Sequence, residues 1–414
     1  MLLIHLQKIT PRTDYAFKHI CTRILGIKVE FTSVIETFIA HQGPKLSYGR
    51  QPMGNELFIQ AHGLLFEQGF EDIDIVVQTW NESIGFFPVG ARSALPFDIF
   101  SAAFYLLSRY EEYLPHLKDD LGRFPAEESL AYKNNFLKKP VVDIWANYFK
   151  KILLQHYPDT QFANRSLHVH HMVEATEPFA YSQRGFLRNF SGFFRDLIRF
   201  RIQSLFRRSR VLMRLRKDPF DTFTWMINAS KNSTAKLSVF FLLGEGFSFQ
   251  EDINSKREKY RMLVKFVADY VEVGLTFSYH SLDDYDRLKQ EKLLMEELTH
   301  RSLRSSRNDK SLVNLPHNYR NLLELEVEKD TTLLYDDHLG FRAGTCTPFL
   351  FYDLDYEIKT PLIIHPMAGR TSTLSGQKKG IIESEVYQLL TEVKNVGGTF
   401  SILLSNKDFM QKNV

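Results

Sequence analysis

From residue 166 onward, apolar runs alternate with amphipathic stretches along the chain. The amphipathic periodicity predicts helices over 283–300 and 383–396. The apolar runs predict strands over 166–175, 236–245, 272–280, 330–341, 361–367 and 397–406. Strands that alternate with helices pair in parallel through right-handed crossovers. The pattern therefore predicts an α/β fold whose chemistry lies in the loops after the carboxyl ends of the strands.

The first part of the chain mixes two amphipathic helices with short strands, which are predicted over 55–62 and 72–80. One helix is predicted over 95–114, and its periodicity places Arg109, Glu111 and Glu112 toward solvent. The other is predicted over 141–157 and ends at Pro158.

The polar stretch 158–166 predicts a domain boundary. Residues 1–160 are expected to form a smaller α/β domain of unknown role, and residues 161–414 a second, larger domain. A length of 414 residues suits two such domains, each with its own apolar core.

Charge and cysteine content exclude several classes of protein. The net charge of +3 is too small to indicate nucleic acid binding by the whole chain. The two cysteines, Cys21 and Cys346, form neither a disulfide framework nor a zinc-binding motif. No run approaches about 18 apolar residues, so no transmembrane helix is expected. We expect a cytoplasmic protein, and peripheral attachment to the inner membrane stays open.

A basic amphipathic segment spans residues 184–217. It contains eleven basic residues and one acidic residue, Asp196, so its net charge is +10 and the rest of the chain carries −7. Phenylalanines and leucines recur at near-helical spacing between the arginines, a composition typical of helices at anionic membrane surfaces. Two alternatives stay open: a helix pair packed on its own domain, and a surface that grips a polyanionic glycan or a lipid phosphate.

The run from His168 to Glu174 crowds three histidines and a glutamate onto one predicted strand. Alternate side chains share a face, so His168, His170, Met172, Glu174 and Thr176 point one way. Residues two apart lie roughly 6 to 7 Å apart, so this strand alone supplies two metal ligands at most. An ordinary strand is the alternative.

Several passages carry a resemblance to a known family. The run from Gly340 to Gly344 at the end of a predicted strand, with the strand before "SYHSL", resembles the polysaccharide deacetylase family (carbohydrate esterase family four, the NodB homology domain). The passages "LPFDIFSAAFYLLSRYEEYLP", "LGRFP", "PVVDIWA", "DPFDTF" and "GFRAGTCTPFLFYDL" make nearly the whole chain similar to deacetylase-like proteins of the Bacteroidetes type, which carry an extra α/β domain in front. The resemblance implies an irregular (β/α)₇ TIM-like barrel.

The resemblance also implies a divalent metal, usually zinc, held by one Asp and two His, with a second Asp acting as base on the metal-bound water. The paired aspartates of that family fall on Glu174 and Thr176, and a metal histidine falls on Thr276. His280 lies four residues further on, so Glu174 and His280 are the remaining candidate ligands. Hydroxyl groups are poor zinc ligands, so this metal centre is expected to have decayed.

The remaining roles that the resemblance implies are assigned to residues of this sequence in the same way. The late-strand acid histidine falls on Ser405, which leaves His365 as the nearest alternative. Glu174, Asp309 and the strand-end Arg342 are the candidate catalytic residues. Arg307, Tyr279 and His365 are the candidate substrate-binding residues. Arg342 has a structural alternative, an ion pair, and Ser281 or Asp283 as a helix N-cap explains "HSLDD" without chemistry.

Three functions follow as expectations. The first is a deacetylase-like protein of envelope glycan metabolism that binds a glycan or partner through a decayed site, without a cofactor. The second is an active carbohydrate N-deacetylase that uses zinc or another divalent metal with an unusual ligand set. The third is a scaffold on an anionic membrane. Neither a G-x-S-x-G elbow nor a phosphate-binding glycine loop is present, which argues against serine hydrolases and nucleotide enzymes.

Overall fold

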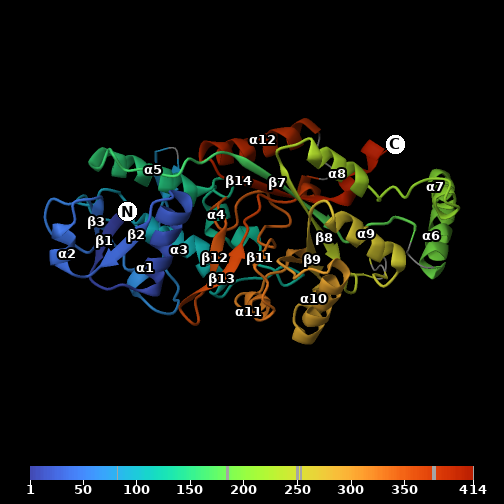
Figure 1. Ribbon diagram of the computed structural model, residues 1–414, viewed down its shortest axis with the longest axis horizontal. Coiled ribbons are helices and arrows are strands. Elements are labelled where there is room, and N and C mark those ends of the chain that lie inside the picture. Colours follow the sequence, from blue (N-terminus) through green and yellow to red (C-terminus); the bar gives the residue numbers. More distant parts are fainter. Residues whose placement is uncertain (82, 183–185, 249–250, 252–253, 375–378, 414) are drawn as a thin grey trace.

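The computed structural model describes residues 1–81, 83–182, 186–248, 251, 254–374 and 379–413. Two sheets and their helices follow one another along an elongated molecule (Figure 1). Among the described residues, no helix has both the length and the apolar character needed to cross a membrane.

The first sheet is built from the amino-terminal residues and is parallel throughout, in the order β2-β1-β3-β4. A separate antiparallel pair, β5 and β6, lies outside it. The strands are β1 (Leu2–Leu6), β2 (Val29–Thr32), β3 (Lys45–Gly49), β4 (Phe58–Gln60), β5 (Gln78–Trp80) and β6 (Ser83–Gly85). The helices are α1 (Pro11–Phe17), α2 (Ile35–Ala40), α3 (Ile99–Leu107), α4 (Leu130–Lys133) and α5 (Val141–His156).

The second sheet has the order β12-β13-β11-β10-β9-β8-β7-β14, and β12 is its antiparallel strand. Its strands are β7 (His168–Ala175), β8 (Lys236–Leu242), β9 (Glu272–Phe277), β10 (Ser305–Asn308), β11 (Lys329–Asp330), β12 (Phe349–Asp353), β13 (Ile358–Ile364) and β14 (Thr399–Ser405). Its helices are α6 (Phe186–Ile198), α7 (Ile202–Leu212), α8 (Phe223–Lys231), α9 (Glu258–Ala268), α10 (Tyr285–Thr299), α11 (His317–Glu324) and α12 (Lys379–Asn395). The α/β class is confirmed.

Backbone hydrogen bonds curl the second sheet into a TIM-like shape. The segment 365–370, which follows β13, runs between β11 and β14. On one side, His365 N donates to Asp330 O at 2.8 Å. On the other side, Ala368 N donates to Ser401 O at 2.8 Å and Leu403 N donates to Gly369 O at 3.0 Å. The carboxyl ends of the parallel strands therefore converge at one mouth.

Strand β7 shows how the interior is layered. As predicted, His170, Met172 and Glu174 share a buried face of the strand, whereas His168, predicted on the same face, is exposed at the start of the strand. Met172 packs with Phe240 and other apolar side chains in the middle of the barrel. His170 lies at the amino-terminal end, where its Nε2 is 2.8 Å from Ser238 Oγ. Because the apolar layer separates them, His170 and Glu174 face opposite ends of the barrel.

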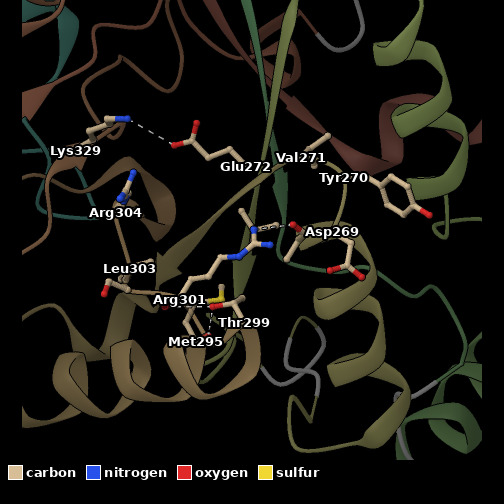
Figure 2. A pocket seen from close by; sticks show the side chains of 13 residues that line it. Asp269, Tyr270, Val271, Glu272, Met295, Thr299, Arg301, Leu303, Arg304 and Lys329 are labelled. Carbon is tan, nitrogen blue, oxygen red and sulfur yellow. Dashed lines mark hydrogen bonds and ion pairs between the residues drawn. The ribbon is translucent and has the colours of Figure 1, made fainter.

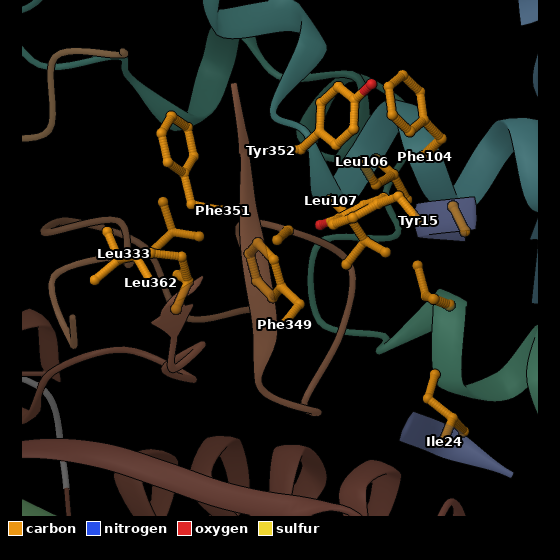
Figure 3. Packing of buried hydrophobic residues seen from close by; sticks show 14 of the residues in the cluster. Tyr15, Ile24, Phe104, Leu106, Leu107, Leu333, Phe349, Phe351, Tyr352 and Leu362 are labelled. Carbon is orange, nitrogen blue, oxygen red and sulfur yellow. The ribbon is translucent and has the colours of Figure 1, made fainter. Parts of the chain in front are cut away.

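Helices from the first part of the chain pack directly against the barrel. Tyr15 of α1 and Phe104 of α3 contact Tyr352 of β12 edge to face, with ring centroids 5.1 and 5.0 Å apart (Figure 3). The Tyr15 hydroxyl donates to Leu350 O at 2.7 Å. Asp143 of α5 accepts from Cys346 N at 3.0 Å. One apolar cluster runs through both parts, so they share a core.

The expectation that Arg109, Glu111 and Glu112 face solvent was wrong. Helix α3 ends at Leu107, and Arg109 adopts a left-handed φ of 54°, so the helical periodicity stops before these residues. All three are buried. Glu112 accepts from Arg109 Nε at 2.8 Å and, through both carboxylate oxygens, from Arg342 at 2.9 and 2.7 Å. A local polar stretch is therefore an internal ion-pair network.

Several other predicted elements differ from those in the structure. The run 330–341 is not one strand, because β11 covers only Lys329–Asp330. The run 72–80 contains only the short β5. Strand β10 was not predicted, since its sequence SSRN lacks apolar alternation; its polar side chains are nonetheless buried in the barrel. The N-cap of α10 is Asp284, not Ser281 or Asp283.

Replacing Glu112 with alanine should lower the free energy of unfolding by about 3–5 kcal/mol, because the buried Arg342 loses its carboxylate partner and the buried Arg109 keeps only Glu111. Burial would raise the pKa of Glu112, but Arg342 and Arg109 lower it to about 2, below its value of 4.5 in an unfolded chain. The stabilisation is therefore present above pH 4.5 and is lost as pH falls through about 2. Urea unfolding at several pH values tests both points.

Arg304→Ala provides the control for this variant. Arg304 and Glu328 form an exposed pair at 3.7 Å, so its loss should change stability by less than about 1 kcal/mol. Equal effects of the two substitutions would contradict a structural role for the Glu112 network.

Candidate functional site

Glu174, at the carboxyl end of β7, lies between two arginines. Arg307 Nε of β10 is 2.9 Å from Glu174 Oε1, and Arg370 Nη2 is 3.0 Å from Glu174 Oε2. The Arg307 contact is electrostatic, because its N–H is not directed closely enough at the oxygen for a hydrogen bond. Arg307 is fully buried and Glu174 is 6% exposed. Both oxygens of this carboxylate therefore already face a positive charge.

The network continues toward the residues before α4. Arg370 also pairs with Asp336, and Arg123 Nη1 lies 3.1 Å from Asp336 Oδ2. Arg123 Nη1 donates as well to Lys310 O at 2.9 Å. Burial alone would raise the pKa of Asp336, yet Arg370 and Arg123 hold it below its usual value. A residue from the first part of the chain thus helps to build the barrel mouth.

Asp309 follows β10 and is the second buried carboxyl at the mouth. Burial and, to a lesser extent, the nearby charge of Glu174 raise its pKa to about 6, against the opposing effect of Lys310. Asp309 Oδ2, Thr276 Oγ1 and Arg307 Nη1 are buried without a hydrogen-bond partner in the protein. Buried polar atoms are usually paired, so this group can bind the hydroxyl or amide groups of a ligand. A carboxyl with this pKa can also exchange a proton near neutral pH.

An aromatic rim borders these polar groups. Phe247 contacts Tyr279 edge to face at 5.1 Å, and the ring of His280 lies parallel to that of Phe247 at 6.1 Å. Lys310 Nζ sits 4.6 Å from the Phe247 centroid and pairs with Glu251 at 2.9 Å. Aromatic faces next to carboxylates and cations suit a ligand with both apolar and hydroxyl-bearing faces.

The structure brings some candidate residues together and separates others. Glu174, Asp309 and Arg307 lie together, and Tyr279 and His280 lie on the rim. Arg342 pairs instead with Glu112, as its structural alternative requires. Burial lowers the pKa of His365 to about 4, and its charged neighbours Lys329, Lys236 and Glu272 all begin strands. His365 therefore faces the amino-terminal end of the barrel, opposite Glu174.

The residues at the mouth do not fit a zinc ion. Thr176 and Thr276 replace the expected ligands, and Glu174 already faces two guanidinium groups, which would repel a divalent cation. His280 is exposed, and its ring packs on Phe247. Across the described part of the chain, three potential ligand atoms come within 4.8 Å of one another at Glu127, Asp337 and His338, a group with no buried member.

A cavity of about 670 Å³ lies at the other end of the barrel (Figure 2). It is lined by residues before or at the start of β9, β10 and β11, among them Asp269, Glu272, Arg304 and Lys329. In parallel α/β folds the chemistry lies at the carboxyl ends of the strands. We therefore place the candidate site at Glu174 and Asp309 and not at this cavity.

Sequence reasoning missed Arg370, Asp336 and Arg123. Arg370 lies in the irregular segment after β13, and Asp336 lies in a stretch that was predicted as strand. Their positions follow from the curl of the sheet, which brings residue 370 beside Leu403 of β14. No local pattern marks these residues as members of a site.

Comparisons with known proteins are sparse. A family of unknown function, DUF7033, matches residues 2–158. A solved structure described as "putative polysaccharide deacetylase from Mycobacterium smegmatis" is similar at 11% sequence identity and a TM-score of 0.36; the match covers 61% of this chain and 84% of that one. No curated protein sequence matches the chain.

Asp309→Asn should stabilise the protein more at pH 8 than at pH 4. The pKa of Asp309 is about 6 in the folded state and 3.8 in the reference state, so the charged form opposes folding above pH 6. This opposition weakens as pH falls through 6 and disappears below about 3.8, where the carboxyl is protonated in both states. The gain at pH 8 should exceed that at pH 4 by about 2–3 kcal/mol, measured by urea unfolding. The exposed Asp159→Asn is the control and should show no such difference.

Proposed function

We propose that this chain is a polysaccharide deacetylase-like protein with an irregular (β/α)₇ barrel, whose mouth binds an N-acetylated glycan without a metal ion. The observation that carries the proposal is the position of Glu174 between Arg307 and Arg370. In the metal-dependent family that the sequence resembles, a carboxylate at this position belongs to a cation-binding site. Here guanidinium groups supply the positive charge, so the carboxylate is balanced without an ion.

The surrounding residues support a carbohydrate ligand. A pyranose ring has an apolar face that packs on an aromatic side chain, and hydroxyl groups that need polar partners. Phe247 and Tyr279 supply the aromatic surface. Asp309 Oδ2 and Thr276 Oγ1 supply polar atoms that lack a partner in the protein. A role in envelope or surface glycan metabolism follows from the same proposal.

One experiment tests whether the protein binds a metal ion: zinc is titrated into the purified full chain and binding is measured by calorimetry. We expect no stoichiometric zinc binding in the micromolar range, and no acetate release from N-acetylated chito-oligosaccharides with or without zinc. Stoichiometric zinc that is lost in Glu174→Gln, accompanied by acetate release, would instead establish an active deacetylase with an unusual ligand set.

A second experiment tests glycan binding: the same oligosaccharides are titrated into the protein and their affinity is measured by calorimetry. Phe247→Ala should weaken their binding by about tenfold, since an aromatic contact contributes roughly 0.5–1.5 kcal/mol beyond the area that it buries. Tyr356→Ala is a matched control, because Tyr356 is exposed and packs against Arg320 away from the mouth. Wild-type affinity in Phe247→Ala, or equal losses in both variants, would contradict a glycan site at this rim.

A further inference from the structure

Helices α6 and α7 form a hairpin at the end of the molecule farthest from the first sheet (Figure 1). Of the basic segment 184–217, Arg184 lies outside the described residues. Arg208 of α7 reaches Asp196 of α6 at 2.8 Å, and both side chains are buried. Gly192 leaves room for this guanidinium group, because a Cβ there would come within 2.5 Å of Arg208 Nη1. These residues define the faces on which the helices meet.

The opposite face of α6 is apolar and exposed. Its members recur at the spacing of one helical face, from Phe190 through Phe193, Phe194 and Leu197 to Ile198. The tip and the start of α7 continue the surface, with Phe200 87% exposed and Phe206 65% exposed. Large apolar side chains of the hairpin are therefore exposed, which argues against the alternative of a helix pair packed on its own domain.

The segment that carries this apolar surface is also rich in basic side chains. Eight of them are exposed: Arg195, Arg199, Arg201, Arg207, Arg210, Arg214, Arg216 and Lys217. The one acidic residue of the segment, Asp196, is buried against Arg208. Arg195, Arg201, Arg207 and Arg208 also line a cavity of about 600 Å³ between the hairpin and the barrel. Contiguous exposed apolar surface with this charge indicates a binding face.

The charge and the apolar character of the hairpin surface together indicate which kind of partner binds it. A second copy of the chain would bring the same positive segment, so the two hairpins would repel one another. A nucleic acid would match the arginines but would leave the aliphatic side chains in water. The surface of an anionic bilayer satisfies both, since phosphates meet the arginines and acyl chains meet the phenylalanines.

We propose that the α6–α7 hairpin binds the surface of an anionic lipid bilayer and holds the barrel there. The aromatic and aliphatic side chains enter the interface between headgroups and acyl chains, and the arginines contact lipid phosphates. This inference is independent of the proposed glycan site.

Co-sedimentation of the full chain with vesicles tests the proposal. Vesicles with about 30% phosphatidylserine in phosphatidylcholine should bind the protein, and vesicles of phosphatidylcholine alone should bind it at least about tenfold more weakly. Binding to the anionic vesicles should fall as salt rises from about 50 to about 500 mM, because screening shortens the reach of the charges.

Two pairs of variants separate the apolar and the electrostatic contributions. The double variant Phe200→Ser with Phe206→Ser should reduce vesicle binding at least about tenfold. Its control is the double variant Met262→Ser with Tyr387→Ser, which removes exposed apolar groups elsewhere on the molecule and should leave vesicle binding unchanged. Arg199→Glu with Arg207→Glu should reduce binding roughly 30-fold. The control Lys265→Glu with Lys289→Glu changes the net charge equally and should have little effect.

Absence of binding to either vesicle type, or equal binding to both, would overturn the proposal. So would equal losses in the hairpin and control variants. Dimerisation seen by analytical ultracentrifugation and abolished by Phe200→Ser with Phe206→Ser, without vesicle binding, would assign the surface to a second copy instead. Thermal unfolding of each variant checks that it is folded, and the exposure of both phenylalanines predicts an unchanged transition.

Discussion

The buried carboxylate of Glu112, held by Arg109 and Arg342, joins the first part of the chain to the barrel. An unpaired charge in such a place would cost several kcal/mol, so docking of the two parts is coupled to the pairing of these charges. The aromatic contacts of Tyr15 and Phe104 with Tyr352 bury the surface around it. Because the barrel mouth takes Arg123 from the first part, this docking also completes the candidate site.

Glu174 repeats the same arrangement at the mouth: one buried glutamate between two arginines. The difference lies in its surroundings. Glu112 is enclosed by protein, whereas Glu174 lies beside Asp309, whose buried Oδ2 has no protein partner. Two guanidinium groups therefore balance the charge of Glu174 within the protein. The mouth also contains polar atoms without a protein partner and an aromatic rim.

The hairpin follows the opposite physical rule from the barrel. Glu112 and Glu174 are buried and paired with arginines; in the hairpin, Phe200 and Phe206 are exposed, and most arginines of the segment are exposed too. The hairpin lies at the end of the molecule farthest from the first sheet (Figure 1). A protein held at a bilayer surface through this end would present its barrel to ligands near that surface.

The local sequence was sufficient to predict the α/β class, the inward face of β7, and helices such as α5 and α10. These features depend on near neighbours, because a period of 2 or 3.6 residues decides which side chains share a face. The substitutions at Thr176 and Thr276, and the charge of 184–217, are also readable without a structure.

The pairing of the buried charges was decided by tertiary structure alone. Arg342 and Glu112 are 230 residues apart in sequence, and Arg370 and Glu174 are 196 apart. Any carboxylate can balance any guanidinium group, so only the curl of the sheet and the docking of α3 select the partners. For the same reason the polar strand β10 and the burial of Arg109 escaped prediction: their solvation depends on residues that are distant in sequence.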